Sequence, residues 1–93
     1  MKSYEGMFLF KPDLSKESLD KVVGQVQEII GKNKGSLDQV NDWGKKKLAY
    51  PIKKYDESFY YLINFHAEPG GISKIKEAVN LNESILRTLI VAG

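Results

Sequence analysis

Hydrophobic and polar positions follow a strand-like pattern in four parts of the chain. Apolar and aromatic residues dominate Tyr4 to Lys11, Ser58 to Phe65 and Ile85 to Val91, and they recur at Val40 and Trp43 in a part that begins near Ser36-Leu37. Such residues suit a pleated, half-buried surface, so each part predicts a β-strand. Gly44, within the second of these strands, predicts a bulge or bend, because a glycine inside a strand has no side chain to pack.

Two parts between these strands have helical spacing instead. In the first, apolar residues recur at i, i+3, i+4, i+7 and i+11 and therefore share one face of a helix. They are Leu19, Val22, Val23, Val26 and Ile30. Asp13 or Ser15 can cap the start of this helix, and Gly35 is expected to end it in the left-handed conformation. A shorter second helix is predicted from the apolar residues Ile72, Ile75 and Val79. Pro69 and the two glycines after it are expected to end the element before this helix.

The predicted order of elements is strand, helix, strand, strand, helix, strand. This order predicts an α+β fold of the ferredoxin-like split βαβ type, with both helices on one face of a four-stranded antiparallel sheet. A chain of 93 residues has room for one hydrophobic core, so we expect a single domain over residues 1–93. The absence of cysteine excludes a disulfide scaffold, a thiolate metal site and a cysteine nucleophile.

The sequence offers no signal peptide or membrane helix. The first ten residues lack a basic stretch followed by a long apolar run. The longest uninterrupted apolar run, Phe59 to Ile63, has five residues, far fewer than the roughly 20 that a membrane helix needs. We therefore expect a cytoplasmic protein with no membrane contact.

The predicted architecture leaves one face of the sheet without helices. If Tyr4, Phe8 and Phe10 point toward the helices, and Ile63 and Phe65 do the same, alternation turns the neighbouring apolar side chains the other way. These outward side chains are Met7, Leu9, Tyr60 and Leu62. A contiguous apolar patch is usually covered by something. Another protein, stacked bases, or a loop or end of this same chain could cover it.

Basic charge is concentrated in one segment. The net charge is only +2, yet residues 43–55 contain no acid and five lysines: Lys45, Lys46, Lys47, Lys53 and Lys54. Lysine is a flexible point charge that suits phosphate oxygens, so the segment could hold a nucleic-acid backbone without reading bases. A solvated hairpin that protects a sheet edge would also be rich in lysine and proline. Charge alone does not choose between the two.

Candidate catalytic groups are few. The single histidine, His66, has no evident triad or metal-ligand partners in the sequence, so we expect it to be structural or solvent-exposed. Small phosphatases that hydrolyse acyl phosphates share the predicted element order, but they need an arginine in the anion-binding loop after the first strand. Here that loop is Lys11 to Leu14, and the only arginine is Arg87. We expect no enzyme, no metal, no cofactor and no small-molecule substrate.

A single-stranded RNA binder of the RNA-recognition-motif type is a second alternative. That fold has the same element order and stacks bases on aromatics of its third strand. Ser58 to Phe65 is rich in aromatics, but Glu57-Ser58 stands where the motif has a basic residue and a glycine. The predicted facing also turns Phe59 and Tyr61 inward, where they could not stack on bases. We interpret these aromatics as core and sheet surface.

Three motifs resemble the family of the sixth protein of the bacterial small ribosomal subunit. They are Tyr4-Glu5, Gly44-x-x-x-Leu48-Ala49-Tyr50-Pro51-Ile52-x-Lys54 and Arg87-x-Leu89-Ile90-Val91. The resemblance covers essentially the whole chain, and the central motif is the specific one. It implies a structural constituent of the small subunit in the cytoplasmic ribosome. It further implies binding to the central domain, or platform, of small-subunit ribosomal RNA, jointly with the eighteenth small-subunit protein and after the fifteenth has prepared the RNA.

The resemblance also implies two sets of contact residues. The expected RNA-binding set is Lys2, Tyr4, Lys45, Lys46, Lys47, Lys53, Lys54 and Arg87. The expected protein-partner set is Met7, Leu9, Tyr60, Leu62, Leu89 and Val91. Some family members extend past the last strand with a charged tail, whereas this sequence ends at Gly93, so we expect no role for such a tail. Lysines stand where relatives can use arginines, which favours contacts to the RNA backbone over bidentate contacts.

Overall fold

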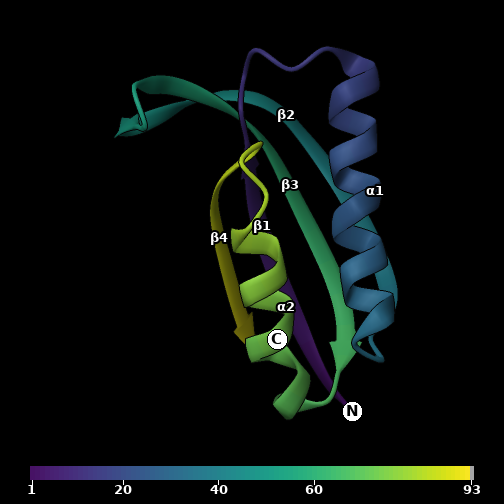
Figure 1. Ribbon diagram of the computed structural model, residues 1–93. Helices are drawn as coiled ribbons and strands as arrows, with labels where there is room; N and C mark the ends of the chain where they lie inside the picture. The colour runs from purple at the N-terminus through teal and green to yellow at the C-terminus, as the bar shows by residue number, and fades with distance from the viewer. Residues whose placement is uncertain (93) are drawn as a thin grey trace.

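The computed structural model describes residues 1–92, which form four strands and two helices (Figure 1). In chain order they are β1 (Lys2–Phe10), α1 (Lys16–Lys32), β2 (Ser36–Ile52), β3 (Tyr55–Ala67), α2 (Pro69–Asn80) and β4 (Ile85–Ala92). The order is the predicted one, so the α+β class of the ferredoxin-like split βαβ type is confirmed. No helix in residues 1–92 is long and apolar enough to cross a membrane.

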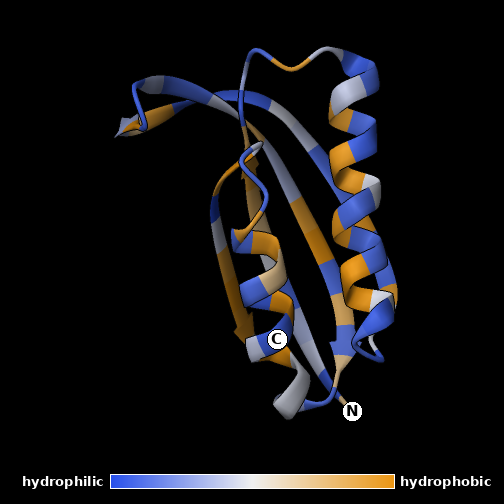
Figure 2. Ribbon diagram, in the orientation of Figure 1, coloured by the Kyte–Doolittle hydropathy of each residue, from blue (hydrophilic) through white to orange (hydrophobic). Residues whose placement is uncertain are grey.

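The strands form one antiparallel sheet in the order β2-β3-β1-β4, and both helices lie on the same side of it (Figure 1). Figure 2 shows hydrophobic residues along the flank of α1 that turns toward the sheet. The core between the two layers includes the fully buried side chains of Phe8, Phe10, Val26, Ile30, Ile63, Phe65, Ile75 and Val79. Tyr4 is half-buried and packs against this core. The predicted inward facing of β1 and β3 is therefore confirmed.

Helix α1 starts as predicted but ends differently. Ser15, rather than Asp13, is the N-cap, and its hydroxyl oxygen accepts a hydrogen bond of 3.2 Å from the amide of Ser18. The prediction that Gly35 is the left-handed residue after the helix is wrong, because Lys34 has that conformation, with φ +63°. Gly35 is needed for space instead. A Cβ there would lie 2.5 Å from Cγ2 of Ile30 and 2.7 Å from its carbonyl oxygen.

Helix α2 begins earlier than predicted. Pro69 was expected to end the preceding element, but it occupies the start of the helix itself. Proline suits the first turn because its fixed φ is already helical and the amide proton it lacks would have no partner there. The buried residues of this helix are Ile75 and Val79, as the spacing predicts.

In the hairpin formed by β2 and β3, the second strand begins earlier than the predicted Ser58. Strand β2 continues through the lysine-rich segment to Ile52, and β3 already begins at Tyr55. The predicted irregularity at Gly44 is confirmed, because the pairing register shifts between Asp42 and Gly44, and Gly44 has φ +77°. A second irregularity lies between Lys47 and Ile52, in the part of β2 where proline interrupts the ladder.

The distal half of this hairpin projects past the rest of the sheet. Strand β1 pairs only with the Phe59–Ala67 part of β3, so residues 46–58 form a two-stranded ribbon that we call the arm. Figure 1 shows the arm curving toward the β4 side of the sheet. At its tip, Lys53 and Lys54 have φ +49° and +74°. Two consecutive residues with positive φ between paired strand ends form a type I′ turn.

Candidate RNA and protein interface

The sheet face away from the helices collects the apolar residues predicted to meet a protein partner. Met7 lies opposite Leu62 on β3 and opposite Leu89 on β4. Residues opposite each other in an antiparallel ladder project to the same side. The same register and strand alternation put all six predicted residues on this side, which we call the open face: Met7, Leu9, Tyr60, Leu62, Leu89 and Val91.

The members of the open face differ in how much surface they offer. Leu89 is 61% exposed and Val91 is 47% exposed, both on the outer strand β4. Met7, Tyr60 and Leu62 are half-buried. Leu9 is only 8% exposed, so it could add little area to a contact with another molecule. The apolar surface is therefore centred on β4, and its role in binding a partner stays a prediction.

Arg87 connects the open face to the arm. It lies opposite Leu9 and therefore projects from the open face. Its Nη1 donates a hydrogen bond of 2.5 Å to the phenolic oxygen of Tyr50 in the arm. Strands β2 and β4 are the two outer strands of the sheet, so this contact requires the arm to curve past β3 and β1 toward β4. Arg87, an exposed residue, is thereby placed beside the arm.

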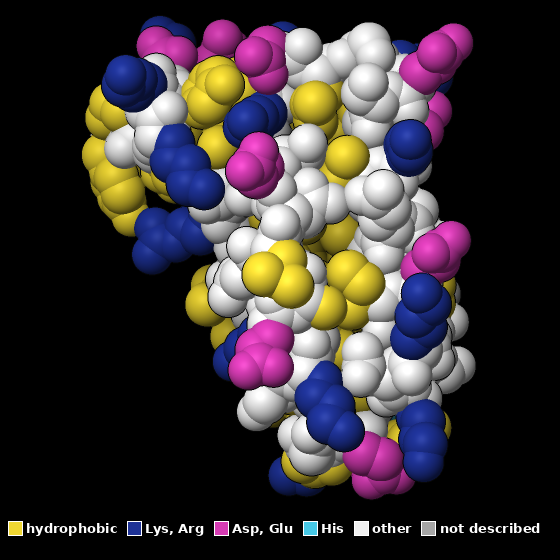
Figure 3. Space-filling model, in the orientation of Figure 1, with side chains coloured by type: hydrophobic (Ala, Val, Ile, Leu, Met, Phe, Trp, Pro, Cys, Tyr) yellow, Lys and Arg dark blue, Asp and Glu magenta, His cyan; other side chains and the backbone are white. Residues whose placement is uncertain are grey.

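The five predicted lysines of residues 45–54 are all exposed. Lys and Arg side chains gather over the arm at the left of Figure 3. Lys45 places its ammonium 5.1 Å from the centre of the Phe59 ring, and Lys46 places its own 5.2 Å from the centre of the Trp43 ring. Within residues 1–92, none of these five lysines lies within 4.0 Å of a carboxylate oxygen in an ion pair. Their charge is therefore available to an anionic ligand.

Lys2 and Tyr4 lie apart from this cluster. Both lie at the start of β1, at the opposite end of that strand from the arm. A strand rises roughly 3.3 Å per residue, so the two ends of β1 are about 26 Å apart. The Tyr4 ring is stacked on Phe65, with 5.7 Å between ring centres, on the helix side of the sheet. The predicted RNA-binding set is therefore one cluster of lysines with Arg87, and a separate pair at the start of the chain.

Trp43 is an exposed aromatic residue that the sequence reading used only as part of a strand. Its side chain is 45% exposed at the bulge of β2, directly before the lysine cluster. The signal in the sequence is a tryptophan followed by glycine and three lysines. Such a side chain could have been proposed as a binding residue, because single-stranded nucleic acids stack on aromatic rings.

A row of hydrogen-bonding side chains crosses the open face at the end away from the arm. Oδ2 of Asp38 lies 2.6 Å from Nδ1 of His66, and Nε2 of His66 lies 2.8 Å from Oγ of Ser3. The sequence reading found no such partners for His66, and the structure corrects it. The order is that of a serine-hydrolase triad, but the Asp38 and His66 side chains are 43% and 41% exposed, so water competes for each bond. The row joins the ends of β1, β2 and β3.

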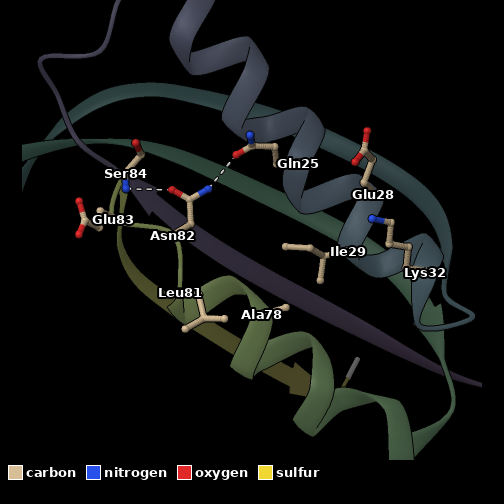
Figure 4. A pocket seen from close by; sticks show the side chains of 9 residues that line it. All are labelled: Gln25, Glu28, Ile29, Lys32, Ala78, Leu81, Asn82, Glu83 and Ser84. Carbon is tan, nitrogen blue, oxygen red and sulfur yellow. Dashed lines mark hydrogen bonds between the residues drawn. The ribbon is translucent and has the colours of Figure 1, made fainter.

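A shallow hollow of about 520 Å³ lies between the two helices, on the side opposite the open face (Figure 4). Asn82 spans one end, where its Nδ2 donates to Oε1 of Gln25 at 2.8 Å and its Oδ1 accepts from the amide of Ser84 at 2.9 Å. Ile29, Ala78 and Leu81 provide its apolar lining. In residues 1–92, no three His, Asp or Glu side chains come together as metal ligands, in this hollow or elsewhere.

A smaller hollow of about 240 Å³ lies beside the start of α1 and includes Tyr61. Burial raises the pKa of the Tyr61 phenol above 10.0, and the nearby carboxylate of Asp42 raises it further. The Tyr61 ring also packs edge-on against Phe10, with 5.5 Å between ring centres. Tyr61 is therefore a core residue, as predicted, and not a surface for stacking bases.

Comparisons with known proteins agree with this architecture. The family model for ribosomal protein S6 matches residues 3–92. The chain is 39% identical over 87 residues to small ribosomal subunit protein bS6 of Geotalea daltonii, covering 94% of this chain and 68% of that protein. It is 33% identical over 91 residues to the bS6 protein of Heliobacterium modesticaldum, covering 98% and 95% of the two chains.

Comparison with solved structures shows which proteins share the fold of this chain. The crystal structure of 30S ribosomal protein S6 from Thermotoga maritima matches with a TM-score of 0.94 at 29% identity, covering 99% of this chain and 87% of that one. The C-terminal domain of MgtC from Mycobacterium tuberculosis matches with a TM-score of 0.65 at 12% identity, which shows a shared fold alone. The chain therefore belongs to the ribosomal protein S6 family, which confirms the resemblance found in its sequence and makes it a non-enzymatic constituent of the small ribosomal subunit in the cytoplasm.

Proposed function

We propose that this chain binds the central domain of small-subunit ribosomal RNA together with the eighteenth small-subunit protein. The observation that carries the RNA half of the proposal is the arm, which extends four exposed lysines from the body of the sheet, with a fifth, Lys45, at its base. Lysine ammonium groups neutralise phosphates and release counterions, which is the main source of sequence-independent affinity. The arm would hold the RNA backbone without reading its sequence.

The backbone at the tip of the arm supports this role. Lys53 and Lys54 both occupy the left-handed region, which costs a residue with a side chain roughly 1–2 kcal/mol. Glycine or asparagine would form the same turn with less strain. A strained position that carries a lysine in place of a better turn residue points to a use for the charge. That use, in the proposal, is contact with phosphates at the farthest point of the arm.

Arg87 is the second element of the RNA surface. One guanidinium nitrogen donates to Tyr50, and the group has further N–H donors in a fixed planar fork. Arg87 is an exposed residue next to the arm, so these donors could contact a phosphate bidentately. The arm and β4 would therefore contact neighbouring parts of the same RNA.

The open face supports the protein half of the proposal. Its exposed centre on β4, Leu89 and Val91, is too apolar to be left in water without a reason. Arg87 lies on the same strand between this surface and the arm. A partner covering the open face would therefore lie next to the bound RNA and could contact both. Such a geometry makes the binding of the protein and the RNA cooperative.

The structure gives less support to the two alternatives, an RNA-recognition-motif type binder and an acyl-phosphate hydrolase. Phe59 and Tyr61 would have to stack on bases in an RNA-recognition motif, but Tyr61 is 6% exposed and Phe59 packs against the core. An acyl-phosphate hydrolase would need a free arginine in the loop after β1, whereas Arg87 lies on β4 and binds Tyr50.

Calorimetric titration of a central-domain junction RNA with this chain, with and without the eighteenth protein, tests the proposal. We expect tight binding only when the partner is present. Two variant pairs separate the surfaces. K45Q/K46Q/K47Q should weaken RNA binding, whereas K32Q/K74Q/K76Q, which removes the same charge from the helical side, should not. L89D should abolish the dependence on the partner, whereas L81D, at a leucine that is 84% exposed on the helical side, should not. No binding by the folded chain under either condition would contradict the proposal.

A further inference from the structure

Trp43 is the single tryptophan of the chain, and the local backbone turns it out of the sheet. The pairing of β2 with β3 passes from Asp42 to Gly44 and skips Trp43. Oδ1 of Asp42 accepts a hydrogen bond of 2.8 Å from the Gly44 amide, and the φ of +77° at Gly44 closes the bulge. The indole ring is therefore held at a fixed position on the edge strand with 45% of its surface exposed.

Lys46 affects how a ligand can contact the Trp43 ring. Its ammonium lies over the indole, 5.2 Å from the ring centre, which is a cation–π contact. The contact restrains the ring and puts a positive charge beside it. A flat ligand can still approach the exposed part of the ring, and any phosphate that it carries would find Lys46 and its neighbours within the same short segment.

The chemistry around Trp43 favours a nucleotide over a protein side chain. Residues 43–55 contain five lysines and no acid, so the surroundings are complementary to an anion. The most exposed residues of the open face, Leu89 and Val91, lie on β4, at the opposite edge of the sheet from β2. Trp43 therefore stands apart from these two residues and within the basic segment. An aromatic ring beside a basic strand is the arrangement with which proteins bind unpaired nucleotides.

We propose that an unpaired nucleobase stacks on Trp43 while Lys45, Lys46 and Lys47 hold the phosphates on either side of it. The inference rests on the proposed RNA-binding function and makes it more specific. The RNA recognised by this chain must present an unstacked base, as in a bulge or junction, next to the strand that the arm contacts. A continuous duplex would offer phosphates to the lysines but no unstacked base to the indole ring.

The fluorescence of Trp43 reports directly on this contact, because no other tryptophan contributes. The probes are an eight-nucleotide oligoadenylate and an abasic oligonucleotide of the same length, titrated at low salt. The two carry the same phosphates, but only the first has bases. We expect oligoadenylate to quench the fluorescence saturably and the abasic chain to leave it unchanged. Equal signals from the two probes would overturn the inference.

Substitution of the ring gives a second, independent measurement. Trp43→Leu should lower the affinity for oligoadenylate roughly 5- to 150-fold and leave the affinity for the abasic chain unchanged. Trp43→Phe keeps an aromatic face and should retain intermediate affinity. Trp43 is exposed, so both variants should fold, which circular dichroism would verify.

Failure of this inference differs from failure of the proposed function. If the junction RNA binds with the eighteenth protein and K45Q/K46Q/K47Q weakens it, but Trp43→Leu does not, only the stacking inference is overturned. If neither the lysine variant nor the tryptophan variant changes binding, both are overturned. A change in Trp43 fluorescence on addition of the eighteenth protein without RNA would assign the ring to the protein contact and would also overturn the inference.

Discussion

Arg87 of β4 donates a hydrogen bond to the hydroxyl of Tyr50 in the arm, although these residues belong to strands at opposite edges of the sheet. The contact holds the arm in its curved position beside the open face. An intramolecular hydrogen bond that replaces hydrogen bonds to water contributes only about 0.5–1.5 kcal/mol to the stability of a fold. Its importance therefore lies in the position of the arm more than in the stability of the domain.

Tyr50→Phe should release the arm while leaving the fold intact. We expect faster hydrogen exchange at amides in residues 46–58, unchanged exchange in the core strands, and a loss of stability no greater than about 1.5 kcal/mol. Hydrogen exchange followed by mass spectrometry or NMR measures this change. Tyr60→Phe is the control, because Tyr60 lies on the open face outside the arm and should leave exchange in the arm unchanged.

Lys54→Gly should stabilise the domain. The φ of +74° at this residue strains a lysine by roughly 1–2 kcal/mol but does not strain a glycine. Part of the gain is lost to the greater freedom of glycine in the unfolded chain, so we expect a net increase of up to about 1 kcal/mol in the free energy of unfolding. Lys54→Ala removes the same charge without relieving the backbone and should be neutral. Equal stabilities of the two variants in urea unfolding would show that the turn is not strained.

Alanine at Gly35 and alanine at Gly24 should have opposite effects. A Cβ at Gly35 would lie 2.7 Å from the carbonyl oxygen of Ile30, so we expect a destabilisation of about 1–3 kcal/mol. A Cβ at Gly24, inside α1, meets nothing within 4 Å, so Gly24→Ala should stabilise by about 0.5–1 kcal/mol. Thermal or urea unfolding compares them. A neutral Gly35→Ala variant would contradict the close packing of the turn after α1.

Tyr61 makes the stability of the folded chain depend on pH in the alkaline range. Its pKa is raised in the folded chain, so the folded state binds the phenolic proton more tightly than the unfolded state does. This contribution is fully present below the unfolded value of about 10 and is lost as the pH rises from there through the folded pKa. In urea unfolding between pH 8 and 11, Tyr61→Phe should lose less stability than the parent chain. All other residues are the same in both proteins, so the difference between the two curves isolates Tyr61.

RNA binding should depend steeply on salt. If the arm and Arg87 neutralise about four or five phosphates, the logarithm of affinity should fall with the logarithm of salt concentration at a slope of roughly −3 to −4.5. K45Q/K46Q/K47Q should make this slope shallower by about 2 to 3, whereas K32Q/K74Q/K76Q should leave it unchanged. Filter binding in the presence of the eighteenth protein over a range of salt concentrations measures both slopes. A slope near zero for the parent chain would contradict phosphate contacts by the arm.

Local patterns predicted those parts of the molecule that depend on neighbours in sequence. The apolar spacing from Leu19 to Ile30 identified α1, and Gly44 identified the bulge in β2. The same local reasoning failed at Pro69 and Gly35, because each of these residue types suits more than one position at a helix end. It also began β3 too late, at Ser58 instead of Tyr55, since Asp56 and Glu57 are not β-favouring residues.

The sequence by itself determined the class of fold, the inward and outward faces of β1 and β3, the location of the basic charge and the family to which the chain belongs. Each of these can be inferred from periodicity, composition or a contiguous motif in the sequence. Only the tertiary structure decided that Arg87 meets Tyr50, that Ser3 and Asp38 flank His66, and that Lys2 and Tyr4 lie far from the arm. Those relationships depend on the register between strands and on the curvature of a long hairpin. Both are set by the packing of residues far apart in the chain, and no local pattern records them.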